Sequence, residues 1–224
     1  MFSRRLNYPF VKNQLSEILD SKDKKSLLNL IESNPTKTGF SYNKKLLKYF
    51  LKDENLSYEP DPKGLKVARD CISVYYKERN ICVDPEDIFV TPGTSEAYSY
   101  IFKILCDPHE NILIPLPGYP LFEYLASLDV VNTKPYRLTY IHGAGWQIDF
   151  DSILNAIDER TKAIVLINPN NPTGSYILPE ERKRIIEIAK TFKISIIVDE
   201  VFFDFNIDEK AERYSFADEK EVLT

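Results

Sequence analysis

Two polar side chains follow short runs of β-branched residues, in positions where they could bind a ligand. Asn171 lies in the loop 168–174, after the apolar run 163–167, and Asp199 ends the run 194–199. An amide donates hydrogen bonds to ligand oxygens, and a carboxylate stabilises a positive charge beside it. The carboxyl ends of parallel strands meet at one edge of a sheet, where ligands bind, so we expect both side chains to lie there.

A third candidate is the segment Gly93-Thr94-Ser95, which opens an apolar helix predicted to reach Leu105. Glycine lets the backbone approach a ligand closely, and a helix start offers unpaired N–H groups with a favourable dipole. The two hydroxyl groups add donors, so this segment is suited to a phosphate. Simple helix capping, with Glu96 nearby, is the alternative, and both can hold together.

Alternating strand and helix patterns position these residues and indicate an α/β fold. Short apolar runs bounded by turn residues predict strands at 27–31, 87–91, 111–115, 163–167, 194–199 and 221–224, and a further strand from 130. Helical spacing predicts helices around 15–19, 46–51, 67–76, 94–105, from 121, 150–157 and 179–192. Pro179, followed by Glu180 and Glu181, is typical of a first helical turn.

Composition restricts the function classes. The 224 residues are 43% hydrophobic, enough for a substantial core, and the net charge of −5 does not favour nucleic acid or an anionic membrane. No apolar run near the start predicts a signal peptide or membrane span. Three cysteines without a disulfide or metal pattern fit the reducing cytoplasm, and two separate histidines predict no metal site.

Asn171-Pro172-Thr173-Gly174, followed by a strand that ends in Asp199-Glu200, resembles the core signature of the class I/II, fold-type I aminotransferases that depend on pyridoxal phosphate. The resemblance runs from about Asn34 to the end of the chain. It implies a three-layer α/β/α sandwich with a mostly parallel sheet. Residues 1–57 would form an amino-terminal arm and part of a small domain, and residues 58–224 the large domain that binds the cofactor, pyridoxal 5′-phosphate.

The resemblance also implies roles for the residues already described. Asp199 would hold the protonated ring nitrogen, with capping of a following helix as the alternative. Asn171 would contact the ring O3′ and the substrate carboxylate. Gly93, Thr94 and Ser95 would form the phosphate cup.

Three further residues enter through the resemblance alone. Tyr119 would pack against the cofactor ring, with a core aromatic as the alternative. Tyr58 would reach the phosphate of a neighbouring subunit, which implies a homodimer; the alternative is an ordinary surface or core tyrosine. Asn34, with Ser33, matches only loosely the place that lies against the substrate carboxylate, and an ordinary strand-ending turn is the favoured interpretation of both side chains.

Two departures from the family pattern matter. Phe202 stands where the family usually has a tyrosine, three residues after the aspartate. No serine–lysine motif for the Schiff-base lysine follows, and Lys210 and Lys220 lie in charged stretches that are typical of solvated surface. We therefore expect the lysine beyond Thr224, no catalytic residue in this chain, and an inactive fragment of a longer enzyme.

Three functions remain open. The parent protein would transfer an amino group between an α-amino acid and a 2-oxo acid, and the sequence does not identify the amino acid. A β-lyase or cyclopropane-carboxylate-synthase-like elimination uses the same core motifs. A non-catalytic regulatory domain that binds pyridoxal phosphate is the third, although residues 1–57 show no basic recognition helix. No nucleophile elbow, Walker loop or dinucleotide fingerprint competes with these interpretations.

Overall fold

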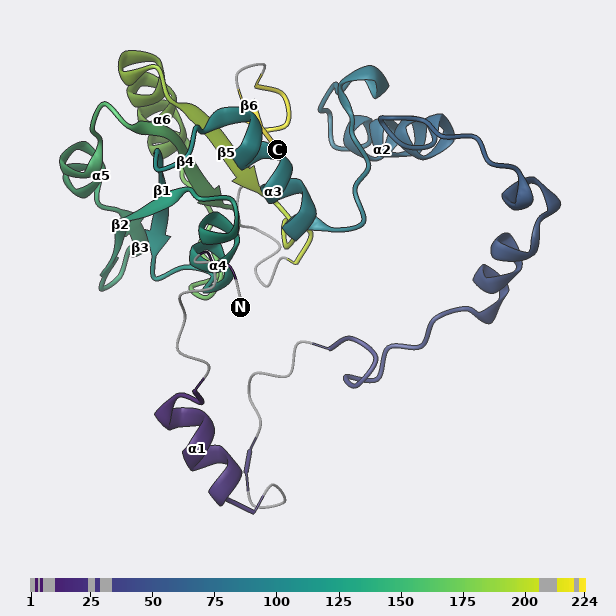
Figure 1. Cartoon of the computed structure of the whole chain (residues 1–224), viewed down its shortest axis with the longest axis horizontal. Helices are drawn as coiled ribbons and strands as arrows, with labels where there is room; N and C mark the ends of the chain where they lie inside the picture. Colours follow the sequence, from purple (N-terminus) through teal and green to yellow (C-terminus); the bar gives the residue numbers. More distant parts are fainter. Residues whose placement is uncertain are drawn as a thin grey trace. The chain divides into compact units, whose positions relative to one another are not determined.

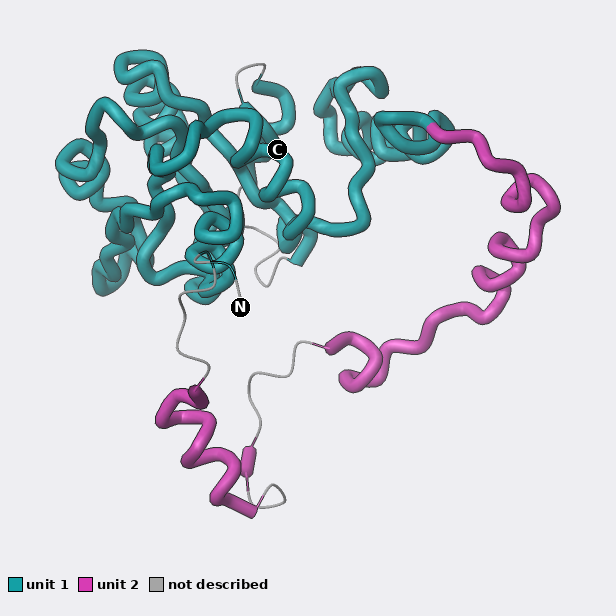
Figure 2. Tube along the Cα trace, viewed as in Figure 1, with its two compact units in different colours: residues 1–6, 61–224 teal, residues 7–60 magenta. Residues whose placement is uncertain are grey.

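The computed structural model describes residues 3, 5, 11–23, 27–28, 34–205, 213–219 and 222–224. The chain divides into two compact units, residues 7–60 and residues 1–6 with 61–224 (Figure 2). The division falls three positions after the boundary expected at 57/58, and the assignment of these parts as domains stays a prediction.

A six-stranded sheet forms the centre of the larger unit (Figure 1). Its strands are β1 (Asn111–Leu116), β2 (Asn132–Ile141), β3 (Gly145–Ile148), β4 (Thr161–Ile167), β5 (Ser195–Asp199) and β6 (Val222–Leu223). Their order is β3-β2-β1-β4-β5-β6, with all neighbours parallel except the antiparallel pair β2–β3. After β1 the chain winds toward β2, whereas after β4 it winds toward β5. The strand order therefore reverses between β1 and β4, which is where open α/β sheets bind ligands.

Two helical layers cover the sheet because alternate strand residues point to opposite faces. On one face Leu166 and Val198 pack with α5 (Phe150–Ala156) and α6 (Pro179–Phe192). On the other face Val165 and Ile197 pack with α3 (Thr94–Leu105) and α4 (Leu121–Leu128). The three-layer α/β/α sandwich with a mostly parallel sheet is confirmed.

The other described helices contribute no residue to the two hydrophobic clusters on the faces of the sheet. The larger unit also contains α2 (Lys66–Lys77) and the 3₁₀ turn η5 (Pro85–Asp87). The smaller unit contains α1 (Gln14–Ser21) and the 3₁₀ segments η3 (Lys44–Leu51) and η4 (Asp53–Leu56). The amphipathic segment 46–51 is thus wound as a 3₁₀ helix, and none of the residues of η3 is buried. No helix in the described ranges is long and apolar enough to cross a membrane.

The predicted strand at 87–91 is wrong. Asp84 accepts a hydrogen bond from the Glu86 N–H and starts η5, which consumes the first residue of the expected strand. Beyond it, Val90 donates one backbone bond to the Lys63 carbonyl, at 2.9 Å, but residues 88–91 join no sheet. The strand expected at 27–31 lies mostly outside the described residues, as do Ser33, Lys210 and Lys220.

Candidate functional site

Two loops meet at the carboxyl edge of the sheet, where the strand order reverses. The loop after β1 contains Gly118, where a Cβ atom would lie 2.2 Å from the Pro115 carbonyl oxygen, so only glycine fits. The loop after β4 contains Asn170, whose amide donates to the Pro117 carbonyl at 3.3 Å. Gly174 lies in this loop with a φ of +73°, a conformation that favours glycine. These contacts fix both loops beside the carboxyl ends of β1 and β4.

Asn168 anchors the loop after β4. Its side chain is fully buried, accepts from the Ile177 N–H at 3.1 Å and donates to the Tyr214 carbonyl at 2.9 Å. Its own N–H donates to the Asp199 carbonyl at 2.8 Å, which joins the ends of β4 and β5. The half-buried Asn171 follows, and its side chain makes no hydrogen bond within the described ranges. Its amide is therefore available to a ligand.

The half-buried carboxylate of Asp199 is held at both oxygens. The Val201 N–H donates to Oδ1 at 2.9 Å, and the Tyr98 hydroxyl donates to Oδ2 at 2.7 Å. Burial, together with the Asp199 charge, raises the pKa of Tyr98, so its hydroxyl remains a donor. Residues 201–204 form turns, so Asp199 does not cap a helix there. Each carboxylate oxygen keeps a second acceptor position for a cation.

Sequence reasoning missed Tyr98, which is 5% exposed and lies on α3. A signal was available, because Tyr98 follows Thr94 by four positions and so shares its face of the helix. The contact of Tyr98 with Asp199, 101 positions away along the chain, required the fold.

The start of α3 offers the predicted donors. Gly93, Thr94 and Ser95 are exposed, and their N–H groups donate to no atom of the described residues. Because Thr94 and Tyr98 lie on one face of α3, the start of this helix is about one helical turn from the residue that holds Asp199. The structure therefore brings the predicted phosphate cup and the predicted carboxylate to the same edge.

Tyr119 comes from the loop after β1. It is half-buried and packs edge-on against Phe122, with ring centroids 5.9 Å apart, at the margin of the α3–α4 layer. This packing fits both interpretations of Tyr119, the ring contact and the core aromatic.

The other two predicted site residues lie in the smaller unit. Tyr58 is 91% exposed. Asn34 accepts hydrogen bonds from the N–H and hydroxyl of Thr36, at 3.0 and 2.6 Å, as expected for the turn that was its favoured interpretation. Their roles toward cofactor and substrate stay predictions.

The residues after Asp199 do not supply the tyrosine expected from the family. Phe202 packs edge-on with Phe205, with centroids 5.9 Å apart, and brings no hydroxyl. Glu200 accepts from the Ser215 hydroxyl at 2.7 Å and the Phe216 N–H at 2.8 Å, and burial raises its pKa. Glu200 thus holds the segment 213–219 on the sheet.

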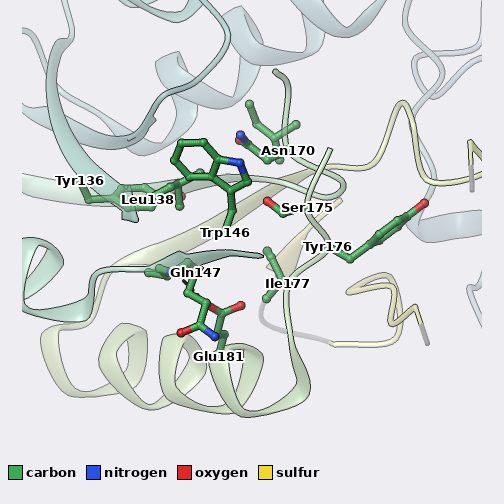
Figure 3. Close-up of a pocket in the computed structure, with 11 residues that line it drawn as sticks. Tyr136, Leu138, Trp146, Gln147, Asn170, Ser175, Tyr176, Ile177 and Glu181 are labelled. Carbon is green, nitrogen blue, oxygen red and sulfur yellow. Dashed lines mark hydrogen bonds between the residues drawn. The ribbon is translucent and has the colours of Figure 1, made fainter. Parts of the chain in front are cut away.

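A small pocket lies beside the loop after β4 (Figure 3). Asn170 and Ser175 line it from the loop, Trp146 from β3 and Glu181 from α6. Glu181 accepts the Ile148 and Leu178 N–H groups, at 2.7 and 2.9 Å, and so ties β3 to the start of α6. Trp146 also packs edge-on with Tyr140, as expected for a packing residue.

The start of α3 and the carboxylate of Asp199 fit pyridoxal phosphate. Unpaired N–H groups at a helix start suit a phosphate dianion, and the held carboxylate of Asp199 suits a protonated ring nitrogen. Within the described ranges no group of three or more His, Cys, Asp or Glu side chains could hold a metal ion.

Comparisons with known proteins agree with this arrangement. The family described as aminotransferase class I and II matches residues 25–224. The tyrosine aminotransferase of Dictyostelium discoideum is 30% identical over 189 residues, which cover 83% of this chain and 45% of that protein. The S-alkyl-thiohydroximate lyase of Arabidopsis thaliana is 34% identical over 147 residues, which cover 65% of this chain and 31% of that protein. An alanine aminotransferase structure from Pyrococcus furiosus has a TM-score of 0.70 at 32% identity, over 81% of this chain and 46% of that one. The chain thus spans less than half the length of each.

Proposed function

Because this chain belongs to the family of class I and II aminotransferases, we propose that it is the cofactor-binding part of an enzyme that uses pyridoxal phosphate to transfer an amino group between an α-amino acid and a 2-oxo acid. When bound, this cofactor withdraws electrons from the carbon that carries the amino group. The chain's own residues bind the cofactor and orient it.

One observation carries the proposal: Asn171, Asp199 and the start of α3 lie at one edge of the sheet. The N–H groups of Gly93, Thr94 and Ser95 bind the phosphate. Asp199 keeps the ring nitrogen protonated through its carboxylate, and Tyr98 and Val201 hold that carboxylate. The amide of Asn171 donates to the ring O3′ and to the substrate carboxylate.

We further propose a cytoplasmic homodimer. The three cysteines are free, which suits a reducing compartment. The exposed Tyr58 hydroxyl would reach the phosphate held by the other subunit. Asn34 would lie near the substrate carboxylate, and the Schiff-base lysine would come from residues beyond Thr224.

An elimination reaction is the second candidate, because a relative that is 34% identical is an S-alkyl-thiohydroximate lyase. Asp199 and Asn171 would serve both reactions in the same way. Analysis of the products formed by the whole enzyme, a 2-oxo acid with a new amino acid or a cleaved side chain, separates them.

The test is calorimetric titration of the chain with pyridoxal phosphate. We expect the wild type to bind and Asp199→Asn to bind at least about tenfold more weakly, because the substituted amide no longer balances the ring cation. Asp151→Asn is the matched control, since Asp151 is exposed on α5 in the opposite layer. Equal binding by wild type and Asp199→Asn, or none by wild type, would refute the proposal.

Borohydride reduction of the bound cofactor, followed by mass analysis, is expected to label no single lysine of this chain stoichiometrically. Stoichiometric labelling of one lysine would place the Schiff base within these residues and contradict our expectation for the lysine.

A further inference from the structure

The Tyr98 hydroxyl donates one hydrogen bond to the Asp199 carboxylate, and this bond joins α3 to the end of β5. The Tyr98 hydroxyl lies 2.7 Å from Asp199 Oδ2, although the phenol comes from α3 and the carboxylate from the end of β5 (Figure 1). A bond of this kind, to an ionised acceptor, is about twice as strong as one between neutral groups. It therefore restricts rotation of the carboxylate.

Aromatic packing fixes the position of the Tyr98 ring. Its centroid lies 5.0 Å from that of Phe122, edge-on, and 5.7 Å from that of Phe102. The ring is buried in the layer formed by α3 and α4. The packing of α3 against α4 consequently holds the hydroxyl where it reaches Asp199.

Resting on the proposed function, we infer that Tyr98 is a positioning residue that orients the Asp199 carboxylate toward the ring nitrogen of the cofactor. Val201 holds Oδ1 and Tyr98 holds Oδ2, so the carboxylate plane is set before a ligand arrives. A preoriented acceptor spends less conformational entropy on binding. Tyr98 acts through Asp199, and its effect disappears when Asp199 carries no charge.

The first experiment uses 4-deoxypyridoxine 5′-phosphate, which has no aldehyde and binds without any lysine. Calorimetry compares wild type with Tyr98→Phe, which keeps the ring and removes only the hydroxyl. The control is Tyr100→Phe, on the same helix, whose hydroxyl donates to Glu96 instead. We expect about tenfold weaker binding for Tyr98→Phe and no change for Tyr100→Phe.

A double-mutant cycle separates positioning from packing. In the Asp199→Asn background, Tyr98→Phe is expected to change affinity by less than about twofold. An equal loss in both backgrounds would show that Tyr98 acts through packing and would overturn the inference. Wild-type affinity in Tyr98→Phe would overturn it as well.

A second measurement needs no cofactor analogue. In the NMR spectrum of the chain alone, the amide proton of Val201, which donates to Asp199 Oδ1, is expected to move upfield in Tyr98→Phe but not in Tyr100→Phe. An unchanged Val201 signal overturns the inference even if the analogue binds. If wild type fails to bind the analogue while the Val201 signal shifts, the proposed function fails and the orientation of Asp199 by Tyr98 stands.

Discussion

Replacing Gly118 by alanine tests how tightly the loop after β1 is built. An alanine Cβ would lie 2.2 Å from the Pro115 carbonyl oxygen and 3.1 Å from the Pro115 carbonyl carbon, whereas ordinary contact begins at 3.4 Å. The oxygen contact is thus 3.4 − 2.2 = 1.2 Å too short, and both atoms belong to the backbone. Backbone shifts of this kind cost about 1–3 kcal/mol, and we expect the upper end of that range here.

Urea unfolding of the chain measures this cost as a lower free energy of unfolding. Gly93→Ala is the matched control, because a Cβ there meets nothing within 4 Å and the backbone is extended, with φ at 173°. We expect Gly93→Ala to equal the wild type or exceed it by about 0.5 kcal/mol. If Gly118→Ala lies within about 0.5 kcal/mol of wild type, the steric reasoning is refuted.

Two further predictions follow from the charge states of buried or paired groups. Burial raises the pKa of the Cys106 thiol to about 11, so iodoacetamide at pH 8 should label the exposed Cys71 and Cys82 before Cys106. Peptide mass mapping checks the order of labelling, and equal labelling of the three cysteines would contradict the prediction. A hydrogen bond from Lys134 is the main cause that lowers the pKa of Asp158. A carboxyl group with a lowered pKa stabilises the folded state at pH values above its unfolded-state pKa, and this stabilisation is lost as the pH falls. Asp158→Asn should therefore lower the thermal unfolding midpoint at pH 7, and the difference in midpoint from wild type should shrink at acidic pH. An equal difference at neutral and at acidic pH would disprove this prediction.

Local patterns predicted much of the larger unit. The helix expected at 179–192 is found as α6 with the same bounds, because Pro179 and two glutamates mark its start and its apolar residues repeat at helical spacing. The runs at 111–115, 163–167 and 194–199 became neighbouring strands because their central residues are apolar and buried on both faces. Asn171 and Asp199 consequently reached the same edge.

The failures share a physical cause, since each depends on contacts between distant parts of the chain. Residues 87–91 have strand composition, but composition does not supply a neighbouring strand. Tyr98 looked like one of several apolar positions of α3, and only the packing of α3 beside β5 gives its hydroxyl a carboxylate to bind. Local sequence does not encode these pairings.

The helix α3 also sets a fixed length within the site. Thr94 and Tyr98 are four residues apart, which is about 6 Å along a helix axis. Backbone hydrogen bonds make that span rigid, whereas a span across a loop would vary with loop motion. A ligand that reaches from the start of α3 to Asp199 is therefore selected by its own length as well as by its charges, and a longer diphosphate ester would not match the span.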